Sequence, residues 1–174
     1  MNATTPNDQT VQIVTAVASG ISICFSFVIF ATFACLQELR TITRQIIICI
    51  TLSDLCTAIS NLTGAIFINT QFEFVRSHIE TDLSPAWCSI QSFVSSTSSL
   101  WSFLWTTAFS LVLYFILVKE NVRQVTFMLP WLHLLCWLLP LLLNITALSL
   151  GKLGYSANDS VTAGWCWIGR FFSK

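Results

Sequence analysis

The segment that decides the fold of this chain is residues 88–118, CSIQSFVSSTSSLWSFLWTTAFSLVLYFILV, which contains no charged side chain. A helix needs about 20 apolar residues to cross the hydrocarbon core of a bilayer, and this segment is longer than that. Lipid offers the backbone no hydrogen-bond partners, so a segment of this kind must satisfy its own backbone by forming a helix. The segment therefore predicts a transmembrane helix.

The rest of the chain has the same character. Of its 174 residues, 55% are hydrophobic and 9% are charged, whereas about a quarter of residues are charged in a typical soluble domain. Charges interrupt the sequence at few places, and the long gaps between them predict membrane helices at 11–36, 46–70, 88–118 and 126–150. The expected fold class is all-α, a polytopic bundle in which residues 1–174 form one transmembrane domain.

The basic residues predict the orientation of the helices, because Lys and Arg concentrate in cytoplasmic connections. The connections after the first and third predicted helices contain Arg40, Arg44, Lys119 and Arg123, whereas the first ten residues contain no basic residue. The last segment opposes this pattern, since it contains Lys152, Arg170 and Lys174. We expect the N-terminus outside the cell and the two basic connections inside.

Sequons and cysteines agree with this orientation. The Asn-x-Ser/Thr sequons at Asn2 and Asn158 fall on the predicted outer side, where they are glycosylation candidates; such sequons are also common by chance. Five cysteines lie inside predicted helices, where free Cys behaves as a small apolar residue: Cys24, Cys35, Cys49, Cys56 and Cys136. Cys88 and Cys166 lie at the outer face, where a disulfide is chemically allowed.

Asp54 is the one formal charge inside a predicted helix. A rise of 1.5 Å per residue from Ile46 places it roughly 12 Å into the membrane, where an ionised carboxylate costs at least a few kcal/mol unless it has a partner. Thr57, Asn61 and Gly64 follow on the same helix face. Two interpretations remain: Asp54 and Asn61 belong to a buried ion or water site that changes during a conformational switch, or Asp54 is neutral and hydrogen-bonded and only fixes helix packing.

The helix at 88–118 has its own stripe of small polar residues, Ser92, Ser95, Ser96, Ser99, Ser102, Thr106 and Ser110. Hydroxyl side chains allow membrane helices to approach closely and to bond across an interface, which favours a packing role. Lining of a ligand pocket is the alternative, with Gln91 and Ser95 near the outer end as candidates. We expect Trp101 and Trp105 to pack against other helices.

Residues for catalysis are not apparent in the sequence. His133 has no Cys, His or acidic companions at metal-ligand spacing, and Pro140 is expected to kink its helix. No catalytic triad, carboxylate pair, phosphate-binding loop or basic nucleic-acid stripe is found. We expect no enzyme activity, no cofactor, no metal and no nucleic-acid partner.

Four motifs resemble the G-protein-coupled receptors, in the group allied to the slime-mould cyclic AMP receptors and the secretin-like class. They are LSDL at 52–55, SSLWSFLWTTAFSLVLY at 98–114, Trp137 with Pro140, and KLGYSANDSVTAGWCWI at 152–168. The last motif is the most specific, and the similarity spans 11–168. The rhodopsin-like Asp-Arg-Tyr is absent after the third helix, where the chain reads FILVKENVR.

The resemblance implies several functional features. It implies a disulfide between Cys88 and Cys166, an unknown extracellular ligand near Trp165 and Trp167, and a heterotrimeric G protein facing the two basic inner connections. The family continues into three more helices, whereas GRFFSK at 169–174 is unlike it. We therefore expect a truncated receptor that does not signal alone and associates with membrane lipid and with full-length receptor. It would lie at the plasma membrane if folded, or be retained in the endoplasmic reticulum.

Two other functions fit four membrane helices. Adhesion or junction proteins such as tetraspanins and claudins carry their cysteines in one larger outer loop, whereas Cys88 and Cys166 lie in two separate outer segments. A transporter fragment would explain Asp54 at membrane depth, but the first two helices do not recur as the third and fourth. The receptor is the interpretation that the sequence favours.

Overall fold

The computed structural model describes residues 6–35, 42–75, 83–150, 153–154 and 167–168. Long helices make up almost all of this part of the chain: α1 (Pro6–Cys35), α2 (Ile42–Val75), α3 (Leu83–Leu117) and α4 (Val122–Ser149). Each of them contains a segment long and apolar enough to cross a membrane. The predicted all-α class with four membrane helices is confirmed, and the chain is a multi-pass membrane protein.

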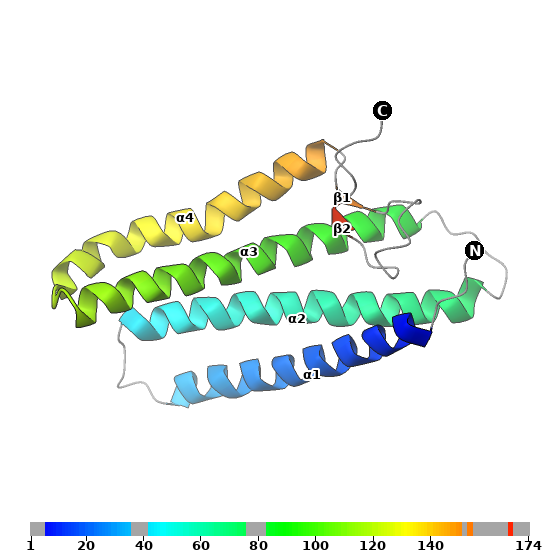
Figure 1. The fold of residues 1–174 in the computed structure, drawn as a ribbon, viewed down its shortest axis with the longest axis horizontal. Coiled ribbons are helices and arrows are strands. Elements are labelled where there is room, and N and C mark those ends of the chain that lie inside the picture. The colour runs from blue at the N-terminus through cyan, green and yellow to red at the C-terminus, as the bar shows by residue number, and fades with distance from the viewer. Residues whose placement is uncertain (1–5, 36–41, 76–82, 151–152, 155–166, 169–174) are drawn as a thin grey trace.

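The helices pack as a row in chain order, with successive helices running in opposite directions (Figure 1). α1 packs on α2, α2 on α3 and α3 on α4. The middle of the row is therefore the interface between α2 and α3, and the polar faces predicted on these two helices meet there.

Each helix begins four or five residues before the charge-free segment that predicted it, because the backbone continues to pair within the helix beyond the hydrocarbon core. α1 begins at Pro6, and proline is tolerated in the first turn, where its missing N–H has no intrahelical partner. α4 is capped by Asn121, whose side chain accepts a hydrogen bond from the Gln124 backbone N–H at 3.1 Å. Glu120, in the connection before it, adopts a positive φ of 48°, so α3 and α4 are joined by a tight turn.

Two very short strands follow α4. β1 (Leu153–Gly154) pairs antiparallel with β2 (Trp167–Ile168), with Leu153 opposite Ile168 and Gly154 opposite Trp167. Both contact α3, near its N-terminal end (Figure 1). The sequence did not predict these strands, since two residues are too few to show the alternation that identifies a strand.

An apolar core joins α2, α3 and α4. It consists of the buried side chains Ile46, Trp105, Ala108, Val112, Val125 and Cys136.

Tryptophans fix α4 to α3 at this core. The Trp101 indole N–H donates to the Trp137 carbonyl at 3.0 Å, with the two rings edge to face at 4.9 Å. One turn further along α3, Trp105 is fully buried and its ring meets the His133 ring edge to face at 4.7 Å. The predicted packing roles of Trp101 and Trp105 agree with these contacts.

Candidate functional site

The polar faces of α2 and α3 meet in a row of side-chain contacts that we call the polar ladder; its members are Asp54, Thr57 and Asn61 of α2 with Ser102, Ser98 and Ser95 of α3. Ser102 Oγ donates to Asp54 Oδ1 at 2.6 Å. Thr57 Oγ1 and Ser98 Oγ lie 2.9 Å apart, and Ser95 Oγ lies 3.5 Å from Asn61 Oδ1. Polar groups thus pair across the helices where lipid would offer them no partner.

Helical spacing creates this ladder. Steps of three and four residues keep the three side chains of each helix on one face, and the antiparallel direction of α2 and α3 matches them in reverse order. The predicted serine stripe is right for Ser95 and Ser102, which contact α2. Ser99, Thr106 and Ser110 are exposed and do not contact α2, because successive hydroxyls of that stripe diverge from the α2 face as the helix turns; their packing role remains a prediction.

Ser98 is the ladder residue that the sequence analysis missed. Its side chain is completely buried and is the partner of Thr57. The signal was its spacing, since Ser98 lies one helical turn before Ser102 and on the same face. Only the pairing of Ser102 with Asp54 reveals which of the many α3 hydroxyls face α2.

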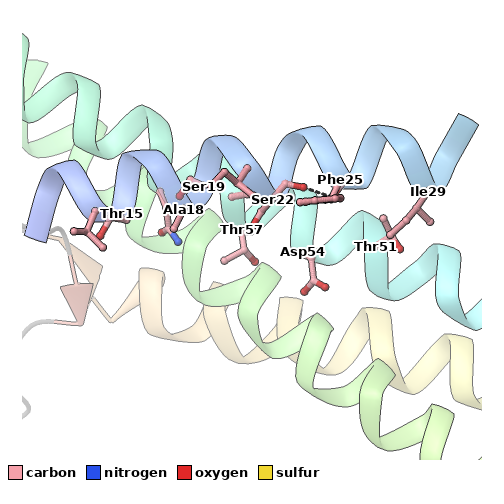
Figure 2. Close-up of a pocket in the computed structure, with 14 residues that line it drawn as sticks. Thr15, Ala18, Ser19, Ser22, Phe25, Ile29, Thr51, Asp54 and Thr57 are labelled. Atoms are coloured by element: carbon pink, nitrogen blue, oxygen red, sulfur yellow. Dashed lines mark hydrogen bonds between the residues drawn. The ribbon is translucent and has the colours of Figure 1, made fainter.

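Asp54 combines a packing contact with exposure. The 2.6 Å distance to Ser102 Oγ is typical of a hydroxyl donating to a carboxylate, and Figure 2 shows the Asp54 side chain directed from α2 toward α3. The residue nevertheless remains exposed. The structure therefore contains the hydrogen-bonded arrangement of the packing interpretation, and the ion or water site remains a prediction.

Asp54 also borders a groove of about 570 Å³ between α1 and α2 (Figure 2). Its α1 side includes the apolar residues Val14, Phe25 and Ile29, and its α2 side includes Thr57 and Asn61 of the polar ladder. The groove therefore places a carboxylate and a carboxamide beside an apolar wall at membrane depth. Sequence analysis identified its polar side but not α1 as the opposite wall.

Gln91, a candidate pocket residue, is buried at the α2–α3 interface with only 6% of its surface exposed. Its side chain lies against Gly64, where an added Cβ would be 1.8 Å from Gln91 Nε2. Ser60 Oγ donates to the Gln91 carbonyl at 3.4 Å. Gly64 therefore lets the two helices approach closely at this level. The predicted pocket roles of Gln91 and Ser95 remain predictions.

Most of the predicted outer-face residues fall outside the described part of the chain: Asn2, Asn158, Trp165 and Cys166. Cys88 lies in α3 and Trp167 in β2, where the backbone but not the side chains is described. The disulfide, the glycosylation sites and the ligand contacts of the tryptophans therefore remain predictions. The five cysteines predicted inside helices are free thiols in the structure.

The basic residues predicted on the inner side have different surroundings. The Arg44 guanidinium lies 4.9 Å from the centre of the Phe33 ring, a cation–π contact between α2 and α1. Lys119 and Arg123 flank the tight turn between α3 and α4 and are exposed, so both are accessible to a partner. Arg40 lies outside the described residues. Contact of these residues with a G protein remains a prediction.

Comparison with known proteins shows that this chain is similar to receptors. Residues 2–174 match the family model described as slime mold cyclic AMP receptor. Human G-protein coupled receptor 157 is 30% identical over 165 residues, covering 94% of this chain and 44% of the human protein, and its mouse counterpart is 32% identical over 158 residues, covering 89% and 43%.

Cyclic AMP receptor 1 of Dictyostelium discoideum is 30% identical over 86 residues, which cover 49% of this chain and 20% of that receptor. The chain thus spans less than half the length of these curated relatives. The polar ladder and the groove beside Asp54 lie inside the region that the family model matches.

Proposed function

Because the chain belongs to the slime mold cyclic AMP receptor family, we propose that its four helices form part of a G-protein-coupled receptor that binds an extracellular ligand and acts on a heterotrimeric G protein. The match of the family model over residues 2–174 carries this proposal. The relatives named above are receptors, which favours this function over an adhesion protein or a transporter fragment.

The polar ladder supports a signalling role for the α2–α3 interface. Asp54 is a charged residue at membrane depth, and such residues are costly unless they contribute to function or are paired. Its carboxylate accepts a hydrogen bond from Ser102, while the residue is exposed and borders the groove. A side chain that is hydrogen-bonded to a neighbouring helix and also exposed can exchange partners as helices move. We assign Asp54 and Asn61 to such a switch.

The proposed topology puts the N-terminus outside, with Cys88 and Cys166 joined on that side. Lys119 and Arg123 then face the cytoplasm beside the exposed turn between α3 and α4. Their exposure supports their role as contacts of a G protein, together with Arg40 and Arg44. The same arrangement puts Gln91, Ser95, Trp165 and Trp167 toward the ligand side.

A chimeric receptor tests the proposal. In human G-protein coupled receptor 157, the 165 aligned residues are replaced by those of this chain, and basal G-protein dissociation is measured in cells with sensors for each G-protein class. We expect the chimera to activate the same class as its parent at matched surface expression. A chimera that reaches the surface like its parent but activates no G protein would contradict the proposal.

Residues 1–174 expressed alone should not activate a G protein. The groove beside Asp54 is then open to lipid, and polar groups in hydrocarbon seek partners. We expect the chain to be retained in the endoplasmic reticulum or to associate with full-length receptor. Surface labelling and co-purification with a tagged full-length relative measure both outcomes, and basal signalling by the chain alone would refute this expectation.

A further inference from the structure

The polar ladder can form in a second register, and we propose that α3 occupies two positions along α2 that are one helical turn apart. This proposal concerns the helices themselves and requires neither a ligand nor a G protein. It rests on the acceptors available to the ladder hydroxyls, on the spacing of polar residues along α3, and on a buried hydroxyl that has no partner in the observed register.

The ladder hydroxyls have a second acceptor within their own helices. Thr57 Oγ1 lies 2.9 Å from Ser98 Oγ but also 3.0 Å from the Ser53 carbonyl. Ser98 Oγ in turn lies 2.8 Å from the Val94 carbonyl. When this contact between the helices breaks, each hydroxyl proton keeps an acceptor one turn back in its own helix. Separation of the pair therefore leaves no buried donor unpaired.

The spacing of polar residues along α3 provides new partners after a displacement of one turn. A turn is about 3.6 residues and 5.4 Å. When α3 moves by this distance toward its own C-terminal end, residues of lower number come opposite α2. Each ladder residue of α2 then meets another polar side chain: Asp54 meets Ser98 or Ser99, Thr57 meets Ser95, and Asn61 meets Gln91 or Ser92.

Ser92 indicates that the second register satisfies a group that the first leaves unpaired. Its side chain is 1% exposed, and its Oγ has no hydrogen-bond partner in the structure. A buried hydroxyl without a partner is destabilising. The displacement brings Ser92 to the level of Asn61, whose carboxamide both donates and accepts.

The tryptophans determine the direction of the movement. A displacement toward the N-terminal end of α3 would bring Trp105 to the level of Asp54, where a large ring would replace the Ser102 hydroxyl, and it would move Ser92 away from Asn61. Trp101 also donates to the Trp137 carbonyl, so α4 moves with α3. The contact of Gln91 with Gly64 holds the observed register. Movement of one element past another by a turn is a known type of switch between packed helices.

Disulfide trapping in the full chain in membranes tests the proposal. Three double variants are oxidised with iodine, and initial rates of cross-linking are measured by mass spectrometry of the linked peptides. Thr57→Cys with Ser98→Cys reports the observed register, and Thr57→Cys with Ser95→Cys reports the displaced one. Thr57→Cys with Ser102→Cys reports the excluded direction and controls for thermal fluctuation of the helices.

We expect the first two pairs to cross-link and the third to remain reduced. A rate for the 57–95 pair no higher than that for the 57–102 pair would overturn the proposal. Absence of the 57–98 cross-link would overturn it as well, since the observed register would then be unoccupied.

Ser92→Ala provides a second measurement in the same variants. This change removes a hydroxyl that has a partner only in the displaced register. It should lower the ratio of the 57–95 rate to the 57–98 rate about threefold, the effect of one interhelical hydrogen bond of average strength in a membrane. An unchanged ratio would show that Ser92 does not favour the displaced register and would overturn that part of the proposal.

Discussion

Two tryptophans one turn apart on α3 allow the contribution of an indole N–H to be measured within the membrane. The Trp101 N–H donates to the Trp137 carbonyl at 3.0 Å, whereas the Trp105 N–H is buried and has no partner. Replacement of either residue by Phe keeps an aromatic ring and removes the N–H. The two substitutions therefore differ mainly in whether a hydrogen bond or an unpaired donor is lost.

The expected free energies follow from these surroundings. Trp101→Phe loses one hydrogen bond, about 0.5–1.5 kcal/mol, together with some packing. Trp105→Phe loses more packing because the residue is fully buried, but it removes an unpaired buried donor whose cost is about 1–3 kcal/mol. We expect Trp105→Phe to be close to neutral and Trp101→Phe to destabilise the chain by about 1–2 kcal/mol.

Equilibrium unfolding in mixed detergent and SDS micelles, followed by circular dichroism, measures both variants against the unmodified chain. Trp105→Ala serves as a control for the ring itself, since loss of a buried Trp side chain costs about 3–5 kcal/mol. A free energy of unfolding that falls more for Trp105→Phe than for Trp101→Phe would refute the reasoning, because the Trp105 N–H would then be making a favourable contact.

Three further predictions concern other parts of the chain. Gly64→Ala should destabilise the helix pair by about 1 kcal/mol, because the new Cβ displaces Gln91. Gly20→Ala should instead stabilise the chain by about 0.5–1 kcal/mol, because no atom lies within 4 Å of the added Cβ. Equal effects of the two substitutions on the free energy of unfolding would contradict this contrast. Asp54→Asn in the chimeric receptor should reduce G-protein activation while surface expression is largely retained, and unchanged signalling at matched expression would assign Asp54 to packing alone. Mass spectrometry of non-reduced peptides should find Cys88 linked to Cys166, and recovery of both as free thiols from mature membrane protein would disprove the disulfide.

The sequence was sufficient for the helices because their signal is local. The charge-free segments identify four membrane helices, and the position of Asp54 identifies the polar face of α2 without knowledge of any neighbour. Partner choice is different, since it depends on how two helices are aligned. Ser98 and Ser99 are chemically identical, yet Ser98 is completely buried against α2 and Ser99 is exposed. Likewise, nothing in the sequence indicated that Gln91 would lie against Gly64, because that contact requires both helices to be in place.

The row arrangement of the helices has a consequence for biosynthesis. α1 and α2 can pair as one hairpin as they leave the ribosome, and α3 and α4 as a second hairpin joined by the tight turn at Glu120. The Asp54 carboxylate then finds its Ser102 partner only when the two hairpins meet, whereas Thr57 and Ser98 keep carbonyl acceptors in their own helices. Until that moment the carboxylate lacks this partner, so we expect joining of the hairpins to be the step at which a chain with a defective polar ladder is retained and degraded.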